Sequence, residues 1–481
     1  MTMGCFSLCL WLNIILSTMG TSEVNFFELV TDSTPSGRVT DGDVTVNFDG
    51  STVAVASSAH QSTIVYTLDG DNYVEQKKLV VPGGQSDIAF GRSIGLDNSG
   101  NTLVVGAEGF VSNDIAAGAA VVFSRVNNEW DAGDMVLPVD SPQDKDLFGY
   151  AVDISDDGSY LIIGAPNAEA PGTQNNSGIA HVFTKEGGWN VGSKPLNQAV
   201  NQSESNYGSL VDIDGLGQAG YVGASGTKLI SLFIRSSDNW DMTFNFRIGN
   251  DGQAFELTTG HMSKNHKVMF LGAPNVHGTG TSGAVFGLQF LENFKYDSST
   301  KIVPLQGSGT VGDRFGTSLS LSHDGTMLAV GAPGEHAVYL YTSSDFQKWA
   351  FILKVENVGQ PGFGEFIQLS GDGSTLVVST TSAANVAIVY RFNFDSGTGG
   401  FWSFLFVVLG ILLLGYFVLF GYRKYKAKTS ISRNMFDEYD PAADDDRYNP
   451  LGNVNRNSTG GAQPEMTEIE LRRQNEGLAQ V

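Results

Sequence analysis

The sequence predicts an all-β protein that folds as a seven-bladed β-propeller, followed by one transmembrane helix and a disordered cytoplasmic tail. Three observations support this prediction. A pattern of aromatic-Gly, Asp-Gly and Val-Gly-Ala recurs along most of the chain, each copy translates into short strands joined by turns, and one long apolar run stands near the C-terminal end. A repeated sheet that cannot bury both of its faces alone must stack on its neighbours, and radial stacking leaves only short protected edges.

The first 20 residues are expected to be a secretory signal peptide. Cys5 to Leu16 form an uncharged apolar run, and the small residues Thr18 and Gly20 follow where a signal peptidase could cleave. No Lys or Arg precedes the run, so a buried strand or helix is the alternative interpretation.

Both cysteines of the chain, Cys5 and Cys9, lie in this segment. The mature protein would therefore contain no disulfide and would rely on its hydrophobic core. Thiol catalysis and cysteine-ligated metals are excluded.

The clearest copy of the repeat consists of Phe315-Gly316, the turn glycine Gly325, and Gly331-Ala332-Pro333. Six further copies keep this register with varying completeness, so that the predicted propeller spans residues 24–392. They start at Thr40-Asp41, Phe90-Gly91, Phe148-Gly149, Tyr207-Gly208, Ala254-Phe255 and Phe363-Gly364.

Each copy predicts four antiparallel strands. In the copy that starts at Phe315, residues 317–322 and 326–332 flank a His-Asp-Gly turn, which is typical of a β-hairpin, and residues 336–342 and 349–355 supply two more strands.

The seventh copy lacks a fourth strand, because the chain enters a linker after Val386 to Phe392. The spare apolar segment Val24 to Val30 resembles the fourth strands of other copies. We expect it to complete the last blade and close the ring; a frayed N-terminal tail is the alternative.

A linker, residues 393–400, leads to an unbroken apolar run over residues 401–422, which matches the ~20 residues that a membrane-spanning helix needs. Arg423, Lys424, Lys426 and Lys428 follow at once, so the positive-inside rule places residues 423–481 in the cytosol. The sequence thus predicts a single-pass type I protein of the plasma membrane or an endomembrane, with its N-terminal part outside or in the lumen.

The chain carries 51 Asp and Glu against 28 Lys and Arg, and nearly all of the excess lies before the apolar run. Such an acidic surface repels nucleic acid and anionic lipid, so we expect no nucleic-acid partner. Solubility in a salty exterior explains the charge without a dedicated cationic ligand.

The repeats resemble FG-GAP repeats, which form the blades of the integrin α-subunit head and of other extracellular propellers. The resemblance covers roughly residues 24 to 392. It implies a β-propeller that binds an extracellular or lumenal partner. The chain departs from integrins because it has no mature cysteine, no leg domains, and Gly421-Tyr422-Arg423 where an integrin tail has a different sequence.

The same resemblance implies calcium as a possible cofactor, because some FG-GAP turns hold this ion with spaced carboxylates. The nearest match here contains Asp212 and Asp214, but Leu216 and Gly220 stand where further oxygen ligands would be expected. The other turns resemble ordinary hairpin turns.

No catalytic motif is present, and the seven histidines are scattered without a metal-binding spacing. Propeller enzymes can assemble a site from inward-facing residues of several blades, which spacing does not reveal. We expect a non-enzymatic protein without a catalytic residue, and buried carboxylates gathered at the propeller axis would favour a hydrolase instead.

Two sequons, at Asn175 and Asn201, predict a glycoprotein. In the tail, Tyr448-Asn449-Pro450-Leu451 resembles the YxxΦ signal that clathrin adaptors read, which makes an adaptor a possible partner.

The sequence therefore favours a cell-surface or endomembrane recognition or adhesion receptor that binds a protein or glycan. A cargo or sorting receptor of the secretory-endosomal pathway is the first alternative, and a membrane-tethered propeller hydrolase is the second. We expect the partner to bind the face with the long insertions, which are residues 108–118, 166–178 and 274–283.

Overall fold

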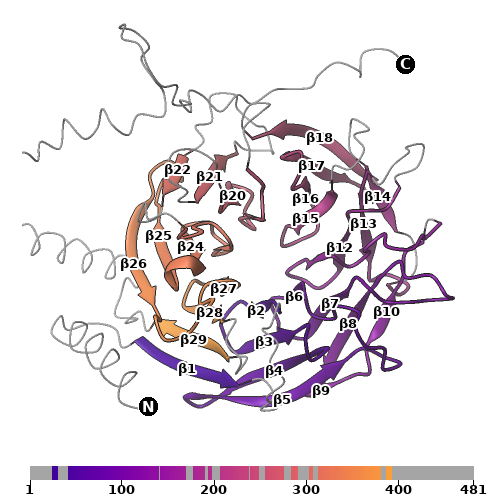
Figure 1. The fold of residues 1–481 in the computed structure, drawn as a ribbon, viewed down its shortest axis with the longest axis horizontal. Coiled ribbons are helices and arrows are strands. Elements are labelled where there is room, and N and C mark those ends of the chain that lie inside the picture. Colours follow the sequence, from indigo (N-terminus) through magenta and orange to yellow (C-terminus); the bar gives the residue numbers. More distant parts are fainter. Residues whose placement is uncertain are drawn as a thin grey trace, which may run out of the picture. The chain divides into compact units, whose positions relative to one another are not determined.

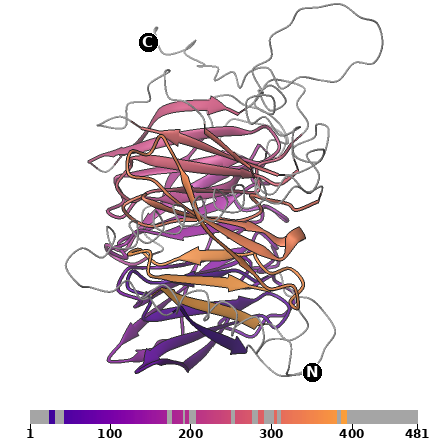
Figure 2. The same cartoon turned by 90° about the vertical axis from the view of Figure 1, so that its left-hand side faces the viewer.

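Seven antiparallel sheets, each of which includes four main strands, are arranged in a ring in the computed structural model of the chain (Figure 1, and turned by 90° in Figure 2). The structure describes residues 24–30, 42–139, 141–169, 177–189, 193–197, 206–237, 239–248, 255–275, 283–290, 303–306, 312–380 and 386–392. The ring lies in a compact unit that contains residues 26–390. Of the described residues, the second unit holds only residues 24, 25, 391 and 392. The all-β, seven-bladed prediction is confirmed.

The blades are numbered here in chain order, and each runs from its innermost strand outward. Blade 1 contains β2 (Val44–Val46), β3 (Thr52–Ser57), β4 (Ser62–Asp69) and β5 (Asn72–Val80). Blade 2 contains β6 (Ile94–Leu96), β7 (Thr102–Ala107), β8 (Ala119–Val126) and β10 (Asp134–Val136), and the short β9 (Glu129–Trp130) also pairs with β8. Blade 3 contains β11 (Ala151–Ile154), β12 (Tyr160–Ala165), β13 (Ile179–Thr184) and β14 (Lys194–Leu196).

Blade 4 contains β15 (Tyr207–Ile213), β16 (Ala219–Ala224), β17 (Leu229–Ser236) and β18 (Asn239–Arg247). Blade 5 contains β19 (Thr259–Met262), β20 (Val268–Ala273), β21 (Ala284–Gln289) and β22 (Val303–Gln306). Blade 6 contains β23 (Leu319–Leu321), β24 (Met327–Ala332), the 3₁₀ turn η2 (Pro333–Glu335), β25 (Ala337–Thr342) and β26 (Ala350–Glu356).

Blade 7 joins the two ends of the propeller. Its inner strands are β27 (Ile367–Leu369), β28 (Thr375–Ser379) and β29 (Val386–Phe392), and its outermost strand is β1 (Val24–Val30). The strand order β1-β29-β28-β27 confirms the predicted closure, and Figure 1 shows β1 beside β29.

The repeated glycines allow neighbouring blades to approach closely. Gly149 of the Phe-Gly pair in blade 3 has a φ of +91°, which L side chains rarely adopt. Its carbonyl oxygen would lie only 2.1 Å from a Cβ added to Gly106 of blade 2. The aromatic-Gly and Gly-Ala parts of the pattern are therefore the two sides of one contact between successive blades.

The hydrophobic core lies between the blades. One cluster combines Val104 and Val122 of blade 2 with Leu161 and Ile163 of blade 3, and comparable clusters join other neighbours. At the closure, Leu29 of β1 is 2 % exposed and packs with residues of blades 7 and 1. Stacking between blades thus supplies the burial that one sheet cannot achieve.

Several predicted segments lie outside the described residues: the signal peptide, the linker 393–400, the apolar run 401–422 and the tail. Among the helical segments that the structure does describe, none has the length and apolar composition needed to cross a membrane.

Leu29→Ala tests the closure. The substitution removes a buried side chain from the contact between blades 7 and 1, so we expect the free energy of unfolding to fall by about 2–5 kcal/mol. Urea unfolding of the full-length protein measures this change. Leu216→Ala is the matched control, since Leu216 is 59 % exposed. Equal unfolding midpoints for the two variants would contradict the packing of β1 in blade 7.

Candidate functional site: the axial cavity

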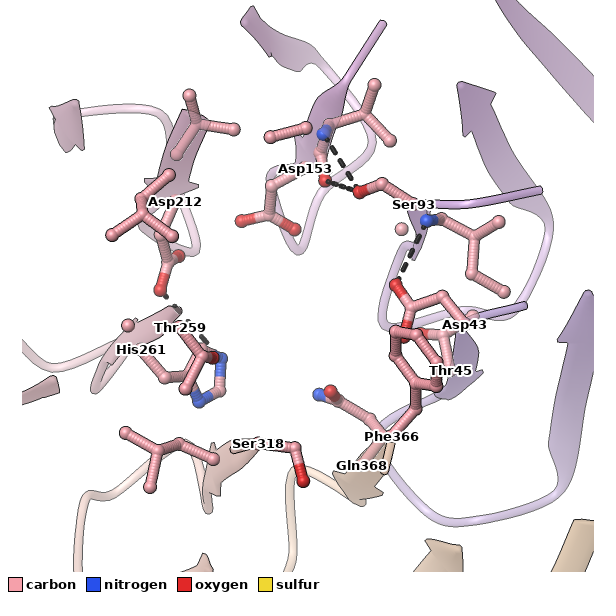
Figure 3. Close-up of a pocket in the computed structure, with 18 of the residues that line it drawn as sticks. Asp43, Thr45, Ser93, Asp153, Asp212, Thr259, His261, Ser318, Phe366 and Gln368 are labelled. Atoms are coloured by element: carbon pink, nitrogen blue, oxygen red, sulfur yellow. Dashed lines mark hydrogen bonds and ion pairs between the residues drawn. The ribbon is translucent and has the colours of Figure 1, made fainter. Parts of the chain in front are cut away.

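A cavity of about 610 Å³ lies at the axis of the ring. The innermost strands of all seven blades line it: β2, β6, β11, β15, β19, β23 and β27. Figure 3 shows polar side chains from several of these strands around one central space. The volume falls within the range typical of small-molecule sites.

The innermost strand of every blade is an edge strand, whose backbone N–H groups need partners on the neighbouring blade. Asp153 Oδ2 of blade 3 accepts a hydrogen bond from the Ile213 N–H of blade 4 at 2.9 Å. Asp212 Oδ2 accepts one from the Met262 N–H of blade 5 at 2.8 Å. Side chains of one blade therefore fasten the backbone of the next.

The same arrangement recurs at four other contacts between blades. Asp43 Oδ2 accepts from the Ile94 N–H, Ser93 Oγ from the Val152 N–H, His261 Nδ1 from the Leu321 N–H, and Ser320 Oγ from the Leu369 N–H. We refer to these six hydrogen bonds as the inter-blade bonds. Carboxylates, hydroxyls and an imidazole all serve as acceptors in them.

Lys264 forms the centre of a buried ionic cluster. Its Nζ lies 3.4 Å from Asp153 Oδ2 and 3.3 Å from Asp212 Oδ1, and it donates to the Ile213 carbonyl oxygen at 2.6 Å. Burial alone would lower the pKa of Lys264, but the two carboxylates raise it above its usual range. Lys264 is therefore a permanent cation with its three donors in use.

Asp43 lies on the other side of the cavity from Asp212, one of the two carboxylates that pair with Lys264 (Figure 3). Burial raises the pKa of Asp43 to about 7, and the nearby Asp153 adds to this effect. Burial also raises the pKa of Asp153 to about 6, because Lys264 offsets it only in part. Both carboxyl groups therefore keep their protons to a higher pH than an exposed aspartic acid does.

Two histidines contribute neutral rings to the lining. Burial lowers the pKa of both His261 and His323 to about 4. Since His261 Nδ1 accepts the Leu321 N–H, the neutral ring carries its proton on Nε2. His261 Nε2 is 3.9 Å from Asp212 Oδ2.

The end of the cavity near the Asp-Gly turns is bridged across the axis. His323 Nδ1 of blade 6 lies 3.3 Å from Asp156 Oδ2 of blade 3. The ring of Phe48, from blade 1, packs edge-on against His323, with 5.2 Å between the ring centroids. Lys264, whose side chain is 12 % exposed, lies at this end too.

The opposite end, where the inner strands begin, carries more exposed side chains. Arg92 and Arg314 are 45 % and 44 % exposed, and they pair with Glu108 at 3.4 Å and Glu365 at 2.9 Å. Arg92 also lies over the ring of Tyr150. The cavity therefore has its mouth on the face that carries the insertion over residues 108–118, which begins with Glu108.

Tyr221 lines the cavity from the second strand of blade 4. Its side chain is fully buried, and its Oη has no hydrogen-bond partner among the described residues. A buried hydroxyl without a partner costs free energy, so this atom is a candidate contact for a ligand.

The predicted calcium residues have separate roles. Asp214 accepts the backbone N–H groups of Leu216, Gln218 and Ala219, so it stabilises the turn after β15. Asp212 lines the cavity and pairs with Lys264. No group of three or more potential metal ligands occurs among the described residues. Calcium binding at this pair stays a prediction.

The other predicted site residues, Asn175, Asn201, Tyr448 and Leu451, lie outside the described residues. Sequence reasoning missed Asp43, Asp153, His261 and Lys264. A signal was available for two of them: Asp153 and His261 occupy the same position of the repeat as Asp212, two residues before the turn.

Comparisons with known proteins agree with this architecture. The family model described as FG-GAP repeat matches residues 140–183, which include β11, β12 and most of β13. One FG-GAP repeat is therefore recognised in the chain, over residues 140–183. No curated protein sequence matches the chain.

Two solved structures are similar to this propeller in fold. Kuenenia stuttgartiensis hydrazine synthase aligns with a TM-score of 0.51 and 14% identity, over 76% of this chain and 99% of that one. The β-propeller domain of Cps50 (Swd1) from Myceliophteria thermophila aligns with a TM-score of 0.51 and 11% identity, over 75% and 99%. At these identities the likeness concerns the fold alone.

Asp43→Asn tests the electrostatics of the cavity. The pKa of Asp43 rises from 3.8 in the unfolded chain to about 7 in the folded protein. The stability that Asp43 contributes to the folded state is therefore complete at pH values below the unfolded-state pKa of 3.8. This contribution is lost as pH rises through 7. We expect the melting temperature of Asp43→Asn minus that of wild type to become more positive between about pH 5 and about pH 8.

Thermal unfolding of the full-length protein across this pH range measures the difference, in which the effects of His261 and His323 cancel because both proteins contain them. Asp69→Asn, in an exposed hairpin, is the control. A difference that does not change with pH would contradict the raised pKa of Asp43.

Proposed function

We propose that this chain is a membrane-anchored recognition receptor of the cell surface or an endomembrane, which binds a protein or glycan partner through its propeller. The FG-GAP propeller fold supports a protein-binding role. The observation that carries the proposal is the rigid ring, whose inter-blade bonds hold the loops around one cavity mouth. Binding residues concentrate on loops positioned by such a scaffold.

The partner site is assigned to the face that bears the cavity mouth. The insertion over residues 108–118 reaches this mouth, because Glu108 pairs with Arg92. Gln85 and Val111 exchange two hydrogen bonds, at 2.8 Å and 3.0 Å, which fasten the insertion to the preceding connection. This loop is therefore pre-ordered for binding.

The direction of β29 supports the same face. As the third strand of its blade, β29 ends at the edge that carries the Asp-Gly turns. Eight residues then lead to the apolar run at residue 401 and span at most about 26 Å. If that run crosses a membrane, the Asp-Gly edge faces the bilayer and the long insertions face away from it.

A sorting receptor that cycles through the secretory-endosomal pathway is the alternative within this class. The tail motif with Tyr448 and Leu451 favours it, with a clathrin adaptor as the cytosolic partner. Substituting Tyr448 by Ala in a tagged chain would then shift the protein toward the plasma membrane.

A membrane-tethered hydrolase is the second candidate function, and the axial carboxylates favour it. Asp43, with a pKa of about 7, could act as a general acid, and the carboxylates of Asp153 and Asp212 lie in the same cavity. Turnover of glycoside or ester substrates that is lost in Asp43→Asn would support this candidate.

We expect the partner to require the long insertions. Replacing residues 108–118, 166–178 and 274–283 by short Gly-Ser links should abolish binding of the full-length protein, in nanodiscs, to cells or to a glycan array. Leu216→Lys with Gln218→Lys alters an exposed Asp-Gly turn and should leave binding unchanged. Binding that survives the loop exchange in a folded protein, but is lost in the turn variant, would reverse the assignment of faces.

A further inference from the structure

The inter-blade bonds do not require charged acceptors. Ser93 and Ser320 accept backbone N–H groups at 3.0 Å and 2.9 Å, as Asp153 and Asp212 do at similar distances. A neutral hydroxyl therefore performs the same structural task without the cost of burying a charge. The carboxylates at the axis therefore carry a negative charge that the fold alone does not need.

The charged groups that face the cavity interior are unbalanced. Asp43, Asp153, Asp156 and Asp212 line it, whereas Lys264 is the cation among the described residues deep in the cavity. The two arginines at the mouth are already paired with glutamates. His261 and His323 carry no compensating charge, because burial keeps them neutral. The acidic groups in the cavity interior therefore outnumber the basic ones, so the interior favours binding of an additional cation.

Asp43 is the carboxylate best placed to receive that charge. Lys264 makes its contacts with Asp153, Asp212 and the Ile213 carbonyl, and none of the ion pairs between described residues involves Asp43. The two oxygens of Asp43 each accept one backbone N–H, from Val44 and from Ile94. Each oxygen keeps a lone pair for a second donor.

The hydroxyl of Tyr221 is an independent sign of a ligand. This side chain is fully buried and lines the same cavity, and its Oη lacks a partner among the described residues. Asp212 and Tyr221 are paired residues of the adjacent strands β15 and β16. A ligand hydroxyl or ammonium group would satisfy this atom.

We propose that the axial cavity binds a small organic cation that bears an ammonium group and hydroxyl groups. The ammonium group pairs with Asp43, and a second polar group of the ligand contacts Tyr221 Oη. The cavity of about 610 Å³ accommodates such a molecule, which enters at the end lined by Arg92 and Arg314. This site is separate from the macromolecular partner proposed above and does not depend on it.

The experiment measures binding of glucosamine and of ethanolamine to the purified full-length protein by calorimetry, in a buffer that contains no other amine, near neutral pH. Glucose is the matched neutral probe, because it has a hydroxyl where glucosamine has the ammonium group. We expect saturable binding of at least one cation, with an affinity about tenfold or more above that of glucose, since hydrogen bonds to charged groups are the stronger ones.

Two variants locate the site. Asp43→Asn should weaken cation binding about tenfold or more, and Tyr221→Phe should weaken it about threefold to tenfold without removing a charge. Asp69→Asn removes an exposed carboxylate and should leave the affinity unchanged. Tyr221→Phe also keeps the test valid if Asp43→Asn does not fold, because the tyrosine hydroxyl makes no described hydrogen bond.

Three results would overturn the proposal: no saturable binding of either cation, equal affinities for glucosamine and glucose, or equal losses in Asp43→Asn and Asp69→Asn. Unchanged cation binding in the loop-exchanged protein would show that this site and the partner face act separately.

Discussion

The backbone N–H groups of the innermost strands are the constraint on which this propeller depends. Each blade has an edge strand at the axis, where a buried N–H without a partner costs free energy. Side chains of the preceding blade supply the acceptors, from Asp43 in blade 1 to Ser320 in blade 6. A second belt joins the turns, in which Asp372 N–H donates to the Phe48 carbonyl between the last blade and the first. These two sets of hydrogen bonds therefore fasten successive blades to one another.

The same constraint explains why polar and charged side chains line the cavity at the axis. Five of the six acceptors of the inter-blade bonds, all except Ser320, also line the cavity. The choice among Ser, Asp and His at these positions therefore affects both the contact between blades and the chemistry of the cavity. Blades 2 and 6 use neutral hydroxyls, whereas blades 1, 3 and 4 use carboxylates. Burying these charges is unfavourable, and Lys264 compensates two of them. Buried carboxyl groups with perturbed pKa values are typical of functional sites.

The two ends of the axial cavity differ in their side chains. Contacts of His323 with Asp156 and Phe48 bridge the end at the Asp-Gly turns, and paired arginines surround the other end. The insertion over residues 108–118 lies at the same end as the arginines, because Glu108 pairs with Arg92. The partner face and the small-ligand site that we propose therefore lie at the same end of the propeller.

The sequence by itself determined the fold class, the seven blades and the closure by Val24–Val30, because hydrophobic alternation and turn glycines act over a few residues. The glycine contacts between Gly106 and Gly149 account for the repeat that made this possible. Only the tertiary structure brought Lys264 to Asp153, which is 111 residues away in the chain. It also separated Asp212 from Asp214. These carboxylates are two residues apart, yet one ends in the axial cavity and the other in its own turn, because a strand residue faces the neighbouring blade and a turn residue caps the local backbone.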